Sequence, residues 1–273
     1  MLGQLDRIVM AQKTLQFVEQ GWYISKSGKR VELPPTKPSV FWSEEDLRQL
    51  GKEPYQRMQN TKIYCSDEGV VDFVFRMQKE GVDLSTVGVL NFASALHAGG
   101  GFLNGAMAQE ECIAYCSNLY DQIKGSPYYE LNHQNKSPLY LHNMIESTVT
   151  FFRNSSWELV DDPATVKVIT SPAVNMGRFL PAIETGKEFD YAREVMKDRM
   201  FLILCLFTEM RCKVIGLGAF GCGVFGNHPT QVAHDWEALL CFMGSAFDEV
   251  VMPVPSTNTG NYEVFSRVFG EKR

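Results

Sequence analysis

The sequence of 273 residues lacks the features that mark membrane-spanning and secreted proteins. No apolar run reaches the 18 residues that a membrane-spanning helix needs, and the longest candidate, Met200 to Phe207, is far shorter. Residues 1–14 include Asp6, Arg7 and Lys13 and do not follow the basic, apolar, small-residue order of a signal peptide. We therefore expect an intracellular, cytoplasmic protein without membrane contact, or a nuclear one if the source is a eukaryote.

The sequence is also poor in positive charge and has no pattern of paired cysteines. Its 26 Lys and Arg residues are outnumbered by 32 Asp and Glu residues, which gives a net charge of −6. A basic face is what a nucleic-acid-binding protein needs, so we expect no direct binding of nucleic acid. Seven scattered cysteines, an odd number, indicate free thiols rather than a disulfide framework. An anionic ligand would have to be held by backbone N–H groups and helix N-termini.

Apolar periodicity predicts an α/β protein with a sheet covered on both faces. We expect strands at residues 86–93, 148–153, 166–170, 213–217 and 249–254, and helices at residues 70–79, 109–124, 185–210 and 229–244. Before them, a helix over residues 5–20 ends at Gly21, and Ser43 opens a short helix with a capping box. We read residues 1–60 as a helical accessory extension and residues 61–273 as one structural unit.

The first of two glycine-rich loops follows the predicted strand at residues 86–93. It contains three consecutive glycines, Gly99 to Gly101, and leads into Gln109-Glu110-Glu111 at a helix start. Three glycines alone are typical of a flexible turn, and acidic residues alone complement a helix dipole. Together they place carboxylates beside a loop that a ligand can approach closely, at the strand end where α/β sheets bind ligands.

The second loop, residues 216–227, follows another buried strand and contains five glycines. Gly216, Gly218 and Gly221 match the G-x-G-x-x-G pattern of dinucleotide-binding folds. That fold needs an acidic residue at the end of the next strand, but this strand ends in Pro253-Val254-Pro255. The motif also lies too near the C-terminus for the usual two-half architecture. We therefore expect a loop of another kind that cradles a diphosphate.

The two loops together resemble a known family. The stretch Asn-Phe-Ala-Ser at residues 91–94, followed by Gly-Gly-Gly-Phe-Leu-Asn-Gly-Ala and Gln-Glu-Glu, resembles the catalytic motif of microbial-type poly(ADP-ribose) glycohydrolases. Residues 218–227 are similar to the diphosphate loop of that family, and residues 11–23 to its leading helix. The resemblance implies a macrodomain-like three-layer fold with a mixed central sheet. His97-Ala98 departs from it, because we expect an Asn-Pro-like pair before the glycines.

The resemblance also implies a reaction and its residues. Glu111 would be the general acid and base that hydrolyses the ribose–ribose bond, and Glu110 would hold ribose hydroxyls. Phe225 would pack on the distal ribose. The substrate-binding residues implied are Ala93, Ser94, Gly99, Gly100, Gly101, Phe102, Gln109, Pro172, Ala219, Phe220, Gly221, Cys222, Gly223, Val224, Phe225 and Gly226. The substrate would be poly(ADP-ribose) or ADP-ribosylated protein, attacked from the chain end, and the product ADP-ribose. The scheme uses no metal and no cofactor.

Two alternatives remain open from the residues. A hydrolase of single ADP-ribose groups on protein or nucleic acid would share both loops and differ on the leaving-group side, near His97 and Phe102. A non-catalytic reader of ADP-ribose would need neither Glu110 nor Glu111 for chemistry, so their presence argues against it. Pro172 also has a plain interpretation, as a turn that ends a strand.

Overall fold

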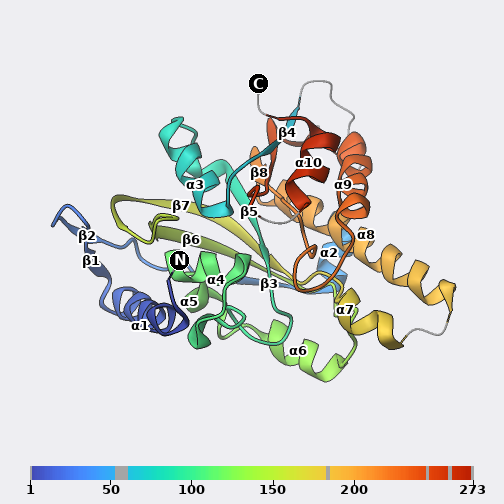
Figure 1. Cartoon of the computed structure of the whole chain (residues 1–273), viewed down its shortest axis with the longest axis horizontal. Coiled ribbons are helices and arrows are strands. Elements are labelled where there is room, and N and C mark those ends of the chain that lie inside the picture. The colour runs from blue at the N-terminus through green and yellow to red at the C-terminus, as the bar shows by residue number, and fades with distance from the viewer. Residues whose placement is uncertain (1, 53–60, 183–184, 244–245, 258–259, 272–273) are drawn as a thin grey trace.

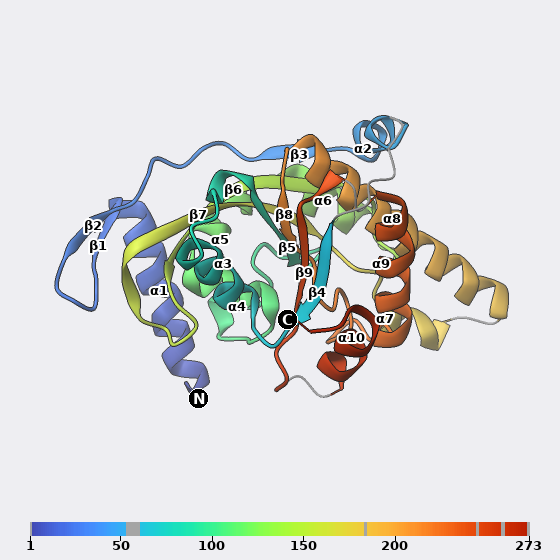
Figure 2. The ribbon, with the colours of Figure 1, turned by 90° about the horizontal axis from the view of Figure 1, so that it is seen from above.

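A seven-stranded mixed sheet lies between two layers of helices in the computed structural model, which describes residues 2–52, 61–182, 185–243, 246–257 and 260–271 (Figures 1 and 2). The strand order is β3-β6-β7-β5-β8-β9-β4. Strands β7, β5, β8, β9 and β4 run parallel, and β6 is antiparallel to both β7 and β3. The strands are β3 (Val40–Trp42), β4 (Lys62–Ser66), β5 (Val87–Phe92), β6 (Met144–Arg153), β7 (Leu159–Ser171), β8 (Val214–Gly216) and β9 (Glu249–Pro253). The predicted α/β architecture with a mixed central sheet is confirmed.

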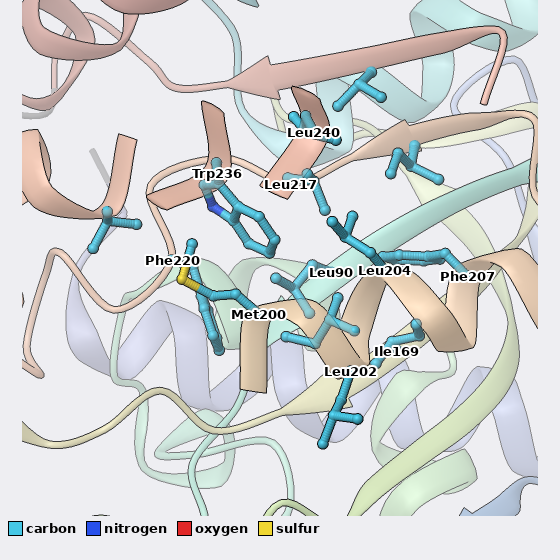
Figure 3. Packing of buried hydrophobic residues seen from close by; sticks show 14 of the residues in the cluster. Leu90, Ile169, Met200, Leu202, Leu204, Phe207, Leu217, Phe220, Trp236 and Leu240 are labelled. Atoms are coloured by element: carbon cyan, nitrogen blue, oxygen red, sulfur yellow. The ribbon is translucent and has the colours of Figure 1, made fainter. Parts of the chain in front are cut away.

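Alternate residues of the central strands pack on opposite helix layers, as a period of two requires. In β5, Val87 and Val89 join the core beneath α3–α6, whereas Leu90 joins the core beneath α8–α10. Figure 3 shows the second core, where Leu90 meets Met200 and Leu204 of α8. The two layers are α3 (Val70–Lys79), α4 (Gln109–Cys116), α5 (Leu119–Ile123) and α6 (Pro127–Asn135) on one face, and α7 (Met176–Phe179), α8 (Gly186–Glu209), α9 (Pro229–Met243) and α10 (Asn261–Phe269) on the other. Among the described helices, none is both long and apolar enough to cross a membrane.

Residues before 61 contribute short strands in addition to the two expected helices. The two predicted helices form, as α1 (Gln4–Gln20) and α2 (Glu44–Leu50), with Ser43 as the cap of α2. Between them, β1 (Trp22–Ile24) pairs with β2 (Arg30–Glu32), and β3 becomes an edge strand of the main sheet. Strands of three residues are too short to show a period in sequence. We propose that residues 1–60 are an elaboration joined to the sheet edge of the unit 61–273.

The helix predicted at residues 109–124 is broken into α4 and α5. Ser117 adopts an extended conformation and pairs with Phe151 of β6 in an isolated bridge. The backbone leaves the helix because β6 offers other partners: the Thr150 amide donates to Asn118 Oδ1 at 2.8 Å. The Ser117 hydroxyl donates to the Ile113 carbonyl at 2.7 Å and so caps the shortened helix. Tertiary hydrogen bonds therefore decide where this helix ends.

Candidate active site

Both glycine-rich loops line one cleft of about 750 Å³ at the C-terminal ends of the parallel strands. Phe92 at the end of β5, Leu217 after β8 and Val254 after β9 form its floor and walls. This is the edge at which open α/β sheets bind ligands, because the loops that leave parallel strands converge there. The predicted site residues that line the cleft are Ser94, Gly100, Gln109, Glu110, Glu111, Ala219, Gly221, Gly223, Val224 and Phe225.

Gln109 fixes the start of α4 to the end of β5. Its side-chain Oε1 accepts a hydrogen bond from the Phe92 amide at 2.9 Å, and its Nε2 donates to the Leu90 carbonyl at 2.7 Å. The amide group thus binds the strand as a neighbouring backbone would. This anchor sets the positions of Glu110 and Glu111, the next two residues of the helix.

Glu110 is a buried carboxyl held by two donors. The residue is only 3% exposed to solvent. Its Oε2 atom accepts a hydrogen bond from the Ser94 amide at 2.7 Å, and its Oε1 atom accepts one from Asn91 Nδ2 at 3.2 Å. Burial raises the pKa of Glu110 from 4.5 to about 8, against the lowering effect of these two hydrogen bonds, and the charge of Glu111 adds to the rise. The surroundings of Glu110 therefore favour its protonated form.

Glu111 lies beside it and accepts two backbone hydrogen bonds. The Gly101 amide donates to Oε1 and the Ala108 amide to Oε2, each at 2.8 Å. Gly100 lies against both carboxyls, with φ of +58°. A Cβ atom at this position would lie 2.3 Å from Glu111 Oε1 and 3.0 Å from Glu110 Oε2. Glycine is therefore required here both by the backbone conformation and by the close approach of the carboxyls.

The second loop turns around the side chain of Asn227. Asn227 Nδ2 donates to the carbonyls of Val174 and Gly221 at 2.8 and 3.1 Å. Gly221 has φ of +72°, and a Cβ there would lie 2.4 Å from that of Ala173. With the base of the loop fixed, its tip over residues 223–225 faces the cleft. The amides of these three residues donate to no residue in the described parts of the chain, so they are available to a ligand.

Phe225 is held at the rim of the cleft from two sides. Its ring centroid lies 6.0 Å from that of Tyr140, and its carbonyl accepts from the Gly177 amide at 3.1 Å. The half-buried ring therefore has a fixed position on the same loop as the available amides.

Comparison with known proteins gives a consistent result. Residues 11–154 match the family model described as microbial-type PARG, catalytic domain. The chain belongs to the microbial-type PARG family. Two crystal structures of poly(ADP-ribose) glycohydrolase from Thermomonospora curvata, one of them bound to the inhibitor ADP-HPD, share 33% identity with it. The first has a TM-score of 0.88, and the match covers 97% of this chain and 99% of that one. The inhibitor complex has a TM-score of 0.87, and the match covers 96% of this chain and 98% of that one.

A structure of the enzyme from Deinococcus radiodurans in complex with ADP-ribose shares 30% identity, with a TM-score of 0.77 over 87% of this chain and 98% of that one. No curated protein sequence matches the chain. The predicted membership of the microbial-type PARG family and its macrodomain-like fold are confirmed.

Some side chains of the PARG motifs lie in the core and not in the cleft. The rings of Phe102 and Phe220 are fully buried; the first packs on Tyr115, with centroids 5.1 Å apart, and the second on Trp236 at 6.4 Å. These rings support the loops that carry them. Predicted site residues outside the cleft lining are Ala93, Gly99, Gly101, Phe102, Pro172, Phe220, Cys222 and Gly226. A substrate-binding role for these residues stays a proposal, in which their backbone groups and not their side chains would contact the substrate.

The departure from the PARG motif at His97-Ala98 leaves a well-held turn. Ser94 Oγ accepts hydrogen bonds from the amides of Leu96 and His97 at 3.2 and 3.1 Å. His133 Nε2 contacts the Leu96 carbonyl at 2.9 Å, and the His97 ring lies against His133 with centroids 5.7 Å apart. Side-chain hydrogen bonds therefore restrain the turn where we expected a proline to do so.

Several residues of the site were not predicted. Asn91 and Asn227 hold Glu110 and the second loop, and the walls include residues 69–72, residues 253–255 and Thr257. Besides its place in the quoted motif, the position of Asn91 inside an apolar run is a sequence signal for it, because a buried amide needs polar partners. The described cleft-lining residues include Asp72, Glu110 and Glu111 but no Lys or Arg. Within the described residues, no three His, Cys, Asp or Glu side chains are placed to hold a metal ion.

Proposed function

We propose that this protein is a poly(ADP-ribose) glycohydrolase that hydrolyses the terminal ribose–ribose bond and releases ADP-ribose. The observation that carries the proposal is the pair of buried carboxyls packed against Gly100, in the same cleft as the available amides of residues 223–225. Membership of a family of catalytic domains supports glycosidase activity. Relatives bound to ADP-HPD and to ADP-ribose support an ADP-ribose unit as the ligand.

In this proposal Glu111 is the general acid and base. It protonates the glycosidic oxygen as the bond from the ribose anomeric carbon breaks, and the leaving ribose departs with a hydroxyl group. The oxocarbenium-like centre is then attacked by water, whose proton returns to Glu111. The proton that Glu111 donates comes from Glu110, whose raised pKa favours its protonated form, and it passes to Glu111 when the substrate binds. Glu110 also binds ribose hydroxyls.

The second loop supplies the remaining parts. The amides of residues 223–225 bind the diphosphate, since backbone N–H groups are the donors that this acidic cleft offers to an anion. Glu110 and Glu111 are adjacent and cannot flank the bond from opposite faces, so the bound diphosphate positions the water. Phe225 packs on the distal ribose and presses it towards the carboxyls.

The size and charge of the cleft support attack from the chain end. Its volume of about 750 Å³ is in the range of pockets that enclose one small ligand. A long groove along an anionic polymer would need basic residues, and the described lining has none. One terminal ADP-ribose unit, held by backbone amides, fits both properties.

Product analysis tests the proposal. The purified protein is incubated with poly(ADP-ribose)-modified protein and, separately, with a singly ADP-ribosylated protein. We expect free ADP-ribose from the polymer, without released oligomers, and an intact single unit on the control. Removal of the single unit would favour the mono(ADP-ribosyl) hydrolase, and binding of ADP-ribose without turnover would identify a reader.

Glu111→Gln tests the assigned acid. Because positioned acids and bases contribute roughly 10²- to 10⁴-fold to rate, we expect kcat to fall at least about 100-fold while the Kd for ADP-ribose changes little. Glu130→Gln, on the exposed side of α6, is the matched control and should keep wild-type turnover. Turnover of Glu111→Gln within about threefold of wild type would exclude Glu111 as the acid.

A further inference from the structure

The segment of residues 101–108, here called the Glu111 loop, begins and ends on the same carboxylate. The amide of Gly101, its first residue, donates to Glu111 Oε1, and the amide of Ala108, its last residue, donates to Oε2. The orientation of the Glu111 carboxylate therefore depends on where the two ends of this loop are held. A shift of the loop would turn one or both donors away from Glu111.

Helix α1 holds the tip of the Glu111 loop. Arg7 Nε donates to the Gly105 carbonyl at 2.7 Å, and Gln4 Nε2 donates to the Asn104 carbonyl at 3.0 Å. Gly105 has φ of +74°, and a Cβ there would lie 2.6 Å from the Gln4 carbonyl oxygen. The helix backbone therefore lies directly against the loop tip, consistent with the position of α1 beside α4 in Figures 1 and 2.

The other carbonyls of the loop are held from α4. The Tyr115 hydroxyl is within hydrogen-bond distance of the carbonyls of Phe102 and Ala106, at 3.1 and 2.9 Å. Tyr115 is part of the same helix as Glu111, so this contact moves with the carboxylate. Arg7 and Gln4, by contrast, tie the loop to a separate element. Of these two, Arg7 makes the charge-assisted bond, which is the stronger kind.

We propose that Arg7 is a positioning residue for Glu111, acting through the Gly105 carbonyl and the Glu111 loop. This inference rests on the proposed function and gives α1 a part in the reaction beyond covering the sheet. Arg7 donates to the carbonyls of Gly105 and Leu2 and is not itself one of the residues that line the cleft. Its effect should appear in kcat, because it orients the acid, and little in the binding of ADP-ribose, because most of the predicted contacts with ADP-ribose lie outside the Glu111 loop.

The test compares Arg7→Met, Arg7→Lys and Lys13→Met. Methionine keeps an apolar stem on the half-buried side of α1 and removes the donor, whereas lysine keeps a cationic donor. Lys13 is exposed on the same helix and serves as the control. We expect Arg7→Met to lower kcat roughly tenfold with KM, the Kd for ADP-ribose and Tm nearly unchanged, since small displacements of a catalytic group are costly. Arg7→Lys should recover most of kcat, and Lys13→Met should match wild type.

Two further measurements separate positioning from mere packing. In the Glu111→Gln background, Arg7→Met should have no further effect on residual turnover, because its effect passes through Glu111. Hydrogen exchange of the amides in residues 101–108 should accelerate in Arg7→Met and not in Lys13→Met. A full additional loss in the double variant, or unchanged exchange, would overturn the proposal. If Arg7→Met does not fold, Gln4→Met releases the neighbouring carbonyl and takes its place in both measurements.

The same data distinguish the two proposals. Wild-type protein that releases no ADP-ribose from the polymer would contradict the proposed function. Hydrogen exchange would then still decide whether Arg7 holds the donors of Glu111, since it needs no turnover.

Discussion

Replacement of Glu110 by glutamine should change how the stability of the protein depends on pH. Burial raises the pKa of this carboxyl from 4.5 to about 8, so the folded protein keeps a proton on it that the unfolded chain has lost. Between these two values the folded state binds more protons than the unfolded state. The contribution of Glu110 to the free energy of unfolding therefore falls as pH rises from 4.5 to about 8 and levels off above it.

The size of the effect follows from the difference between the two pKa values. Each pKa unit corresponds to about 1.4 kcal/mol, so ionising Glu110 in the folded protein costs up to about 5 kcal/mol at high pH. Glutamine resembles the protonated acid and cannot titrate. Its Nε2 would meet Asn91, whose Oδ1 is buried without a hydrogen-bond partner among the described residues and can accept from it after the amide turns over.

Urea unfolding of wild type and Glu110→Gln at about pH 5 and about pH 9 measures this. We expect similar free energies of unfolding near pH 5 and a variant more stable than wild type by several kcal/mol near pH 9. Other titrating groups cancel in the difference, and Glu130→Gln, at an exposed site, should follow the wild type at both pH values. Parallel curves for wild type and Glu110→Gln would refute the reasoning, because they would mean that Glu110 ionises in the folded protein at no cost.

Two further predictions concern the cleft. Gly100→Ala would place a Cβ 2.3 Å from Glu111 Oε1. We therefore expect turnover of poly(ADP-ribose) to fall roughly 100-fold, with the far-ultraviolet circular dichroism spectrum unchanged. Near-normal turnover would contradict the close approach. The described cleft lining has no Lys or Arg. The Kd for ADP-ribose, measured by calorimetry, should therefore change less than about threefold between low and high salt. A tenfold weakening at high salt would indicate that cationic side chains bind the diphosphate.

Local patterns predicted the regular elements well where they are long. The helix expected at residues 70–79 is α3 with the same ends, and those expected at 185–210 and 229–244 are α8 and α9 to within one residue at each end. Such elements are predictable because one apolar stripe and local caps specify them. The edge strand β3 and the break at Ser117 were not predicted, since both depend on pairing with β6, more than 30 residues away along the chain.

The sequence by itself determined the family, the α/β class and the two loops that carry the chemistry. It could do so because glycines with forced conformations and adjacent carboxyls are local features of the chain. Only the tertiary structure decided which motif side chains face the cleft: Glu110 and Glu111 line it, whereas Phe102 and Phe220 are buried beneath their loops.

The tertiary structure also decided the raised pKa of Glu110 and what α1 contacts. The pKa of Glu110 rises because surrounding elements exclude water from it, and burial is a property of the folded chain and not of a motif. Arg7 reaches the Gly105 carbonyl across 98 residues of sequence. No local pattern marks such a contact, because it exists only once the helix and the loop have packed together.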